Sequence, residues 1–146
     1  MTVWTQLLSP MVTEAPKALE CAATPLEIRG LLARLEEALP AGICDPRIEL
    51  ALAEALNNVA EHAYGNGRGM IALEVSSCSE ALRIALRDQG RPMPEFAVPA
   101  DEMPDPDALP EGGWGWGLIH ACCDGIDYQR IAGENRLTLT FRRMES

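Results

Sequence analysis

Residues 46–69 read PRIELALAEALNNVAEHAYGNGRG, and this stretch carries the strongest structural signal in the chain. Its apolar residues recur every three or four positions, which predicts an amphipathic helix over about 46–64. Asp45 followed by Pro46 is typical of a capped helix start, and the glycines that begin at Gly65 end the helix. The apolar stripe of this helix consists of Ile48, Leu52, Leu56, Val59 and Ala63.

The opposite face of the predicted helix carries Glu54, Asn58 and Glu61, spaced by four and three residues. A solvated polar face is the simpler interpretation of this pattern. The adjacent asparagines Asn57 and Asn58 weaken it, because asparagine is a poor residue for a helix interior. A carboxylate and an amide oxygen one turn apart can instead order a water or hydroxyl and a hard cation such as Mg²⁺.

Further elements are predicted on both sides of this helix. They are a strand over about 17–23, a helix over about 25–39 with a capping box at Thr24–Glu27, strands at Met70–Ser77 and Ala81–Arg87, a helix over about Leu118–Cys123, and a last hairpin of Ile126–Ala132 and Arg136–Arg143. Their order predicts an α+β fold, a two-layer sandwich with helices on one face of a mostly antiparallel sheet. We expect residues 1–16 to form a tail or an edge strand, and 17–146 to form a single domain.

Composition excludes several classes of function. The 146-residue chain holds 12 basic and 22 acidic residues, a net charge of −10 that argues against nonspecific nucleic-acid binding. Lys17 is its single lysine, so no lysine follows a glycine-rich loop as a Walker-type phosphate site requires. No run is apolar enough to cross a membrane, and no targeting segment is recognisable. Five cysteines without a CxxC pair predict neither a disulfide framework nor a zinc site, so we expect a reduced, cytoplasmic protein.

A second motif, Arg87-Asp88-Gln89-Gly90, stands at the end of a predicted strand. An ordinary turn is one interpretation of these residues. A buried aspartate at a strand end could instead accept a hydrogen bond from an exocyclic amine, and Gly90 would let a ligand ring approach the backbone.

The third motif is the glycine-rich segment Glu111–Leu118, EGGWGWGL, which opens a predicted helix. Backbone N–H groups at such a helix start can bind phosphate, although a flexible hinge is an equally simple interpretation. The stretch 92–111 before the helix holds six prolines, six acids and no basic residue. We therefore expect residues of about 92–112 to form a lid or binding loop without regular structure.

In this order and at these separations, the three motifs resemble the N, G1 and G2 boxes of the GHKL ATPases, the superfamily with the Bergerat ATP-binding fold. The likeness is greatest to the RsbW-like group, the anti-sigma-factor serine/threonine kinases of bacterial partner-switching systems. It covers about residues 17–143, which is almost the whole chain.

The resemblance implies a role for each motif residue. Glu54 would be the general base for the attacking serine or threonine hydroxyl, and Asn58 would bind Mg²⁺. Asp88 would accept from the adenine amino group, and glycines of the third motif would shape the lid hinge and the phosphate-binding helix start. The nucleotide-binding set that it implies is Asn58, Asp88, Gly90, Gly113, Gly115, Gly117 and Leu118.

One position departs from the pattern of these kinases. Glu111 stands where some relatives carry an arginine just before the glycines. Arg68 and Arg91 are the basic residues nearest to the motifs in sequence. They could supply the missing charge to the phosphates, or they could be ordinary surface arginines.

The resemblance implies an ATP- and Mg²⁺-dependent protein serine/threonine kinase that also acts as an anti-sigma factor. It would phosphorylate an anti-sigma-factor antagonist of the STAS type and sequester a sigma factor. It would work as a homodimer, without direct nucleic-acid or membrane contact. The alternative is a non-enzymatic, nucleotide-gated binding module. An enzyme built on the adjacent Cys122 and Cys123 lacks a supporting base or metal site in the sequence.

Overall fold

The structure is a computed structural model that describes residues 16–39, 45–78, 80–94, 98 and 114–142. The expected tail or edge strand before residue 16, most of the expected lid, and Gly113 lie outside the described residues. The elements along the chain are β1 (Lys17–Ala22), α2 (Pro25–Ala38), α3 (Pro46–Asn58), the π-helical turn η2 (Val59–Ala63), β2 (Met70–Ser77), β3 (Ala81–Asp88), α4 (Trp114–Cys122), β4 (Gly125–Ile131) and β5 (Glu134–Arg142).

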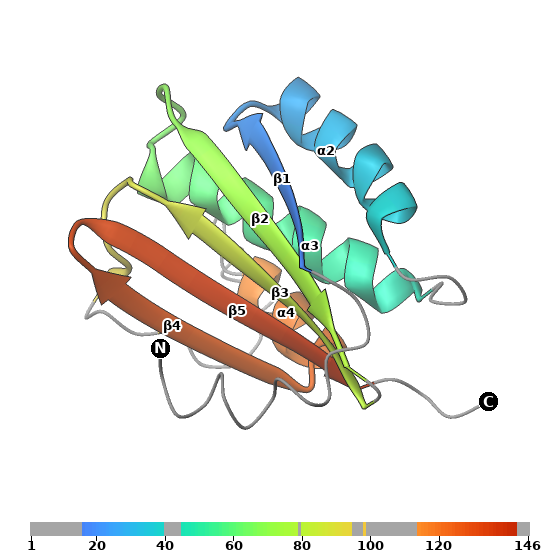
Figure 1. Cartoon of the computed structure of the whole chain (residues 1–146). Helices are drawn as coiled ribbons and strands as arrows, with labels where there is room; N and C mark the ends of the chain where they lie inside the picture. Colours follow the sequence, from blue (N-terminus) through green and yellow to red (C-terminus); the bar gives the residue numbers. More distant parts are fainter. Residues whose placement is uncertain (1–15, 40–44, 79, 95–97, 99–113, 143–146) are drawn as a thin grey trace.

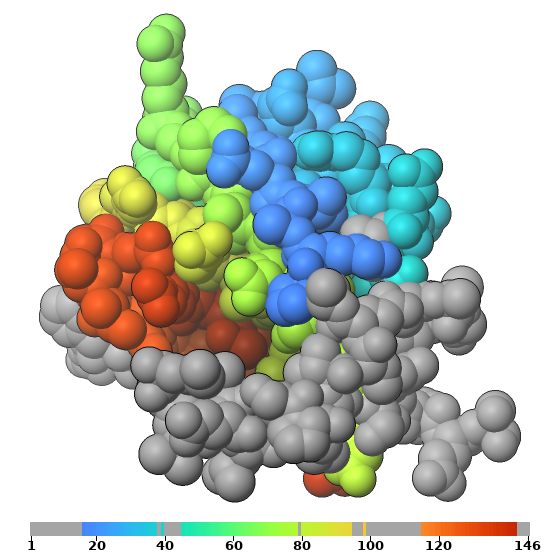
Figure 2. All heavy atoms as spheres, in the orientation of Figure 1, coloured from blue at the N-terminus to red at the C-terminus, as the bar shows by residue number. Residues whose placement is uncertain are grey.

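The described elements form two layers (Figure 1). One layer is a five-stranded sheet in the order β1-β2-β3-β5-β4, in which every neighbouring pair is antiparallel. The helices form the other layer, with α3 and α4 behind the strands in Figure 1 and α2 beside β1. Figure 2 shows the atoms of β1 and α2 lying together at one edge of the molecule. The α+β sandwich predicted from the sequence is confirmed.

Buried and more exposed side chains alternate along the strands, and the buried ones form the core between the two layers. Register aligns Leu73 with Leu86 and Leu86 with Leu137, so apolar side chains form rows across three strands. These three residues are at most 4% exposed. Burying a leucine of this kind contributes about 1.5–3 kcal/mol to folding. The helices cover these rows with buried residues of their own, which include Leu31, Leu35, Ile48, Leu52 and Leu56.

Both long helices begin as predicted. The hydroxyl of Thr24 accepts a hydrogen bond from the Glu27 backbone N–H, at 3.3 Å. A carboxylate oxygen of Asp45 accepts from the Arg47 N–H, at 3.0 Å. In each case a proline follows the capping residue, where its missing N–H costs nothing.

The end of the second helix differs from the prediction of one α-helix over 46–64. The α-helix ends at Asn58 and continues as the wider turn of η2, in which the Tyr64 N–H donates to the Val59 carbonyl. The Tyr64 hydroxyl donates to the Met70 carbonyl at 2.7 Å and accepts from the Gln89 N–H at 2.9 Å. Tyr64 therefore links the helix end by hydrogen bonds to the start of β2 and to the end of β3.

The glycine-rich helix also begins earlier than predicted, at Trp114 rather than Leu118. Gly115 and Gly117 therefore lie within its first turns and not in a hinge before it. Glycine disfavours a helix by about 1 kcal/mol relative to alanine, so sequence propensity alone places the start too late. Tertiary packing overrides propensity here, because Trp116 and Ile119 bury their side chains in the core.

Candidate functional site

The polar face of α3 is not fully solvated, because the first turn of α4 packs against it. A Cβ placed on Gly115 would lie 3.0 Å from Glu54 Oε2, 3.4 Å from Asn58 Nδ2 and 3.5 Å from Asn58 Oδ1. The carboxylate and the amide predicted to act together therefore converge beneath α4. Glu61, the third residue of that face, is exposed to solvent.

Asn58 has an unpaired polar atom at this convergence. Its Nδ2 is buried and donates to no acceptor among the described residues. A buried donor without a partner costs about 1–3 kcal/mol, and such groups are rare in folded proteins. The oxygen-rich donor set of Glu54 and Asn58, beside the N–H groups of a helix start, fits a ligand with phosphate oxygens and a hard cation.

Asp88 lies at the end of β3, on the face of the sheet that the helices cover. It continues the buried row of Leu82, Ile84 and Leu86, and is itself 5% exposed. One oxygen, Oδ1, accepts from the Gly90 N–H at 2.9 Å and from Asn135 Nδ2 at 2.8 Å. The other oxygen has no hydrogen-bond partner among the described residues. Burial raises the pKa of this carboxyl above its usual value, although its two donors and Arg130 oppose the shift.

Gly90 is explained by packing against the end of the long helix. A Cβ at this position would lie 2.4 Å from the carbonyl oxygen of Ala63, which no relaxation of a side chain could relieve. Only glycine allows the chain after Asp88 to pass so close to η2.

Arg91 contacts the same helix end. Its backbone N–H donates to the Ala63 carbonyl and its guanidinium donates to the His62 carbonyl, both at 2.8 Å. These carbonyls belong to the last turn of the helix, where a cation is favourable. Arg91 is thus engaged as a helix cap, and both Arg91 and Arg68 are exposed.

Three residues that the sequence analysis missed complete the surroundings of Asp88. Asn135 comes from β5, and Tyr128 and Arg130 come from β4. The predicted last strand began at Arg136, one residue too late to include Asn135. The signal was present, because Asn135 continues the alternation of Leu137, Leu139 and Phe141 towards the end of the strand that pairs with Asp88.

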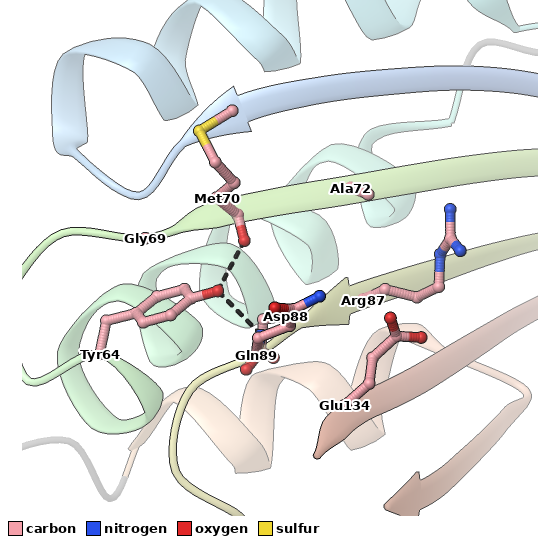
Figure 3. A pocket seen from close by; sticks show the side chains of 8 residues that line it. All are labelled: Tyr64, Gly69, Met70, Ala72, Arg87, Asp88, Gln89 and Glu134. Carbon is pink, nitrogen blue, oxygen red and sulfur yellow. Dashed lines mark hydrogen bonds between the residues drawn. The ribbon is translucent and has the colours of Figure 1, made fainter. Parts of the chain in front are cut away.

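A cavity of about 390 Å³ lies at the same end of the sheet (Figure 3). Its lining residues are Tyr64, Gly69, Met70, Ala72, Arg87, Asp88, Gln89 and Glu134. Ala72 and Arg87 alternate with the core residues of their strands, so most of this cavity belongs to the outward face of the sheet. It therefore adjoins Asp88 but does not include Glu54 or Asn58.

The predicted site residues thus fall into two groups that lie at different points along one long helix. Glu54, Asn58 and Gly115 form one group, and Asp88 and Gly90 form the other, against Ala63. Gly117 is buried and Leu118 half-buried within α4. Asn58 and Ala63 are five residues apart, roughly 7 Å along a helix axis.

The adjacent cysteines offer no second reactive centre. Burial raises the pKa of the Cys122 thiol and raises that of Cys123 to about 12. Both thiols are therefore protonated near neutral pH, and a protonated thiol is a poor nucleophile.

The fold and the motif geometry together define an ATP-binding domain of the GHKL type. Residues 13–141 match the family described as "Histidine kinase-like ATPase domain", and the chain belongs to this family. An ATPase domain implies ATP as the ligand.

A kinase is among the most similar proteins. The chain is 32% identical over 91 residues to "Serine-protein kinase RsbW" of Halalkalibacterium halodurans, across 59% of this chain and 56% of that protein. The chain spans about half the length of this curated relative. The match confirms the likeness to RsbW-like kinases.

A solved structure shares the fold. The RsbU and RsbW domains of Rv1364c from Mycobacterium tuberculosis match with a TM-score of 0.57 and 20% identity, over 88% of this chain and 32% of that chain. In the part of the chain that the structure describes, no helix has the length and apolar character to span a membrane.

Proposed function

We propose that this protein is an ATP-dependent protein serine/threonine kinase that acts as an anti-sigma factor in a partner-switching system. The observation that carries the proposal is the convergence of Glu54 and Asn58 beneath the start of α4, with Asn58 Nδ2 buried and unpaired. The family match and the likeness to a serine-protein kinase support it.

The two groups of residues suit the two ends of ATP. The free oxygen of Asp88 can accept from the adenine amino group, while the first turn of α4 offers backbone N–H groups to the phosphates. Asn58 would contribute its amide oxygen to Mg²⁺, which usually keeps several waters and takes few protein ligands. Bound Mg²⁺ would neutralise charge on the phosphates. Among the described residues, no cluster of three or more His, Cys, Asp and Glu side chains could hold a metal, which suits a site completed by phosphate oxygens.

Glu54 would handle the proton of the transfer step. The hydroxyl oxygen of the substrate forms a bond to the γ-phosphorus, and the bond from that phosphorus to the bridging oxygen breaks to release ADP. Glu54 takes the hydroxyl proton as the new bond to phosphorus forms. Its position one helical turn before Asn58 keeps the base next to the phosphate end of the nucleotide.

The partners in this proposal follow from the likeness to RsbW. The substrate would be a STAS-type anti-sigma-factor antagonist that carries a serine or threonine, and the sequestered partner a sigma factor. A homodimer acting in the cytoplasm is part of the same proposal. Apolar residues near the N-terminus, at Val3, Trp4, Leu7 and Leu8, could pack at such an interface, and they lie outside the described residues.

A nucleotide-gated binding module without kinase activity is the second candidate. One observation favours it, because α4 packs so closely over Glu54 that a Cβ on Gly115 would lie 3.0 Å from Glu54 Oε2, and this restricts the approach of a protein substrate to that carboxylate. In such a module ATP would set the shape of the binding surface, and no phosphate would be transferred.

Phosphotransfer separates the two candidates. Purified protein is mixed with ATP labelled at the γ-phosphate, Mg²⁺ and a STAS-type anti-sigma-factor antagonist, and the mixture is sampled over a single turnover. Label on a serine or threonine of the antagonist supports the kinase. Tight ATP binding and partner binding without any label would support the module instead.

A further inference from the structure

The inward rows of three adjacent strands change from apolar to polar at the same end of the sheet. On β3 the row ends at Asp88, on β5 it ends at Asn135, and on β4 Arg130 follows Tyr128. Register places Asn135 opposite both Asp88 and Arg130. A buried amide therefore stands between a buried carboxylate and a guanidinium.

Asn135 uses all four hydrogen-bonding positions of its amide. Its Nδ2 donates to Asp88 Oδ1 and to the Arg91 carbonyl, each at 2.8 Å. Its Oδ1 accepts from the Tyr128 hydroxyl at 2.5 Å and from Arg130 Nη1 at 3.0 Å. The two donors on Oδ1 also fix which end of the amide faces Asp88, because neither could donate to an NH₂ group.

The same side chains hold the backbone that follows Asp88. Arg130 Nη1 donates to the Gly90 carbonyl at 2.6 Å, and the Tyr128 hydroxyl accepts from the Met93 N–H at 3.0 Å. With the bond from Asn135 to the Arg91 carbonyl, the chain from Gly90 to Met93 is fastened at three points. Neither the carboxylate nor its loop can then turn independently.

We propose that Asn135, held by Tyr128 and Arg130, is the positioning residue that orients the Asp88 carboxylate for adenine. The inference rests on the proposed function, because adenine is taken as the ligand of Asp88. The bond from Asn135 and the bond from the Gly90 N–H both end on Oδ1, which leaves Oδ2 for the exocyclic amine. Asn135 acts through Asp88 and does not itself contact the nucleotide.

Nucleotide titration of the full chain tests the proposal. Dissociation constants are measured for Mg·ATP, Mg·GTP and Mg·tripolyphosphate, a probe that carries phosphates without a base. Asn135→Ala should weaken ATP binding roughly tenfold or more, the usual effect of losing a hydrogen bond to a charged group. It should reduce the preference for ATP over GTP and leave tripolyphosphate within about twofold.

Arg136→Ala is the matched control. Arg136 follows Asn135 on β5, but it is exposed on the other face of the sheet and pairs with Glu134 at 2.8 Å. Its removal should leave all three dissociation constants unchanged. Asn135→Asp is used where Asn135→Ala does not fold, because it keeps the shape of the side chain and removes the donor to Asp88.

A double-mutant cycle separates positioning from general support of the fold. With Asp88→Asn already present, adding Asn135→Ala should change ATP binding less than about threefold, since the contact it supports is gone. Equal losses in both backgrounds would overturn the proposal, as would parallel loss of ATP and tripolyphosphate binding. A wild-type chain that binds tripolyphosphate but not ATP would overturn the proposed adenine contact itself.

Discussion

Two asparagines, Asn135 and Asn58, occupy opposite ends of the candidate site and differ in one respect. Asn135 has a partner for each of its donors and acceptors, whereas Asn58 has a buried Nδ2 with none among the described residues. At the end of the site where we propose that adenine binds, the amide that holds Asp88 is therefore satisfied within the protein itself, and Asp88 Oδ2 is left for the ligand. At the end where we propose that the phosphates bind, Asn58 Nδ2 lacks an acceptor among the described residues, and a phosphate oxygen can supply one. The end at Asn135 and Asp88 is held in place before the ligand arrives, whereas the end at Asn58 needs the ligand to satisfy it. This arrangement suits a site that binds the base first and receives its remaining polar partners from the phosphates and their cation.

Glu54→Gln gives the largest expected effect and lies at the incomplete end. Glutamine keeps the size and an acceptor oxygen of glutamate but removes its basicity. Phosphorylation of the antagonist should fall by about 10²–10⁴, the usual contribution of a general base, while ATP affinity stays within a few-fold. Single-turnover transfer from labelled ATP, run beside a nucleotide titration, measures both.

Glu61→Gln is the matched control for that experiment, because Glu61 lies two turns from Glu54 on the same helix and is exposed. It should transfer phosphate at the wild-type rate. Parallel loss of ATP affinity and activity in Glu54→Gln would make Glu54 a binding or structural residue. Undiminished transfer would remove the assignment of Glu54 as the base.

Asn58→Ala should remove the dependence of ATP affinity on Mg²⁺. For the wild-type protein, calorimetric titration should show much tighter ATP binding with Mg²⁺ than without. In Asn58→Ala the affinity for Mg·ATP should fall roughly tenfold or more, and most of the gain from Mg²⁺ should disappear. Equal wild-type affinity with and without Mg²⁺ would contradict the role of Asn58 as a metal ligand.

The preference for adenine over guanine tests the proposed role of Asp88. Adenine presents an amino donor where guanine presents a carbonyl acceptor, which would face the Asp88 carboxylate. Such a mismatch costs about 1–3 kcal/mol, and more when one group is charged. In a competition titration, GTP should displace ATP only at a concentration well above that of ATP. Displacement at equal concentration would show that Asp88 does not recognise the base.

The free energies of unfolding of Asn135→Ala and Asn58→Ala, measured without nucleotide, test the difference between the two asparagines. Asn135→Ala leaves Asp88 and the Arg91 carbonyl each short of a donor. We therefore expect it to lower the free energy of unfolding by about 1–3 kcal/mol. Asn58→Ala removes a donor that has no partner, so the unfolding free energy should stay the same or rise. Denaturant titrations of both variants measure the difference. Equal losses would mean that Asn58 is already paired in the free protein.

The pH dependence of stability gives the smallest effect. Burial raises the pKa of Asp88, so the folded state keeps its proton to higher pH than the unfolded chain does. The contribution of this carboxyl is fully present below its unfolded pKa, about 3.9, and is lost as the pH rises through the folded pKa. The unfolding free energy of wild type relative to Asp88→Asn should therefore fall as the pH rises from about 4. Parallel curves of unfolding free energy against pH for wild type and Asp88→Asn would contradict the raised pKa of Asp88. Asp127→Asn, at an exposed position, is the control.

Local signals in the sequence predicted most of the fold. Capping residues, proline positions and apolar periodicity located α2, α3 and all five strands within a few residues. Asp88 was predicted as a buried carboxylate at a strand end, because the alternation of its strand and the following glycine are local features. The early start of α4 could not be predicted in this way, since Gly115 and Gly117 are helical only through packing on α3 and the core.

The rest of the site depends on contacts between distant segments. The π-helical turn of η2 depends on where Tyr64 and Arg91 find partners, 25 and 29 positions away in the chain. Asn135 was missed because the predicted strand began one residue after it, and its role could not be predicted because its partners lie on three separate segments. Alternation along β5, extended by one residue, is the signal that would have found it.

The sheet order has a consequence for the time at which the site forms. β5 inserts between β3 and β4, and Asn135 reaches Asp88 across 47 positions of sequence. All three recognisable motifs end by Leu118, so a growing chain carries them long before the donor to Asp88 is synthesised. If Asp88 binds adenine as proposed, nucleotide specificity is acquired last, when the final hairpin docks. A nascent chain that stops before β5 would then display the motifs without the donor that orients Asp88.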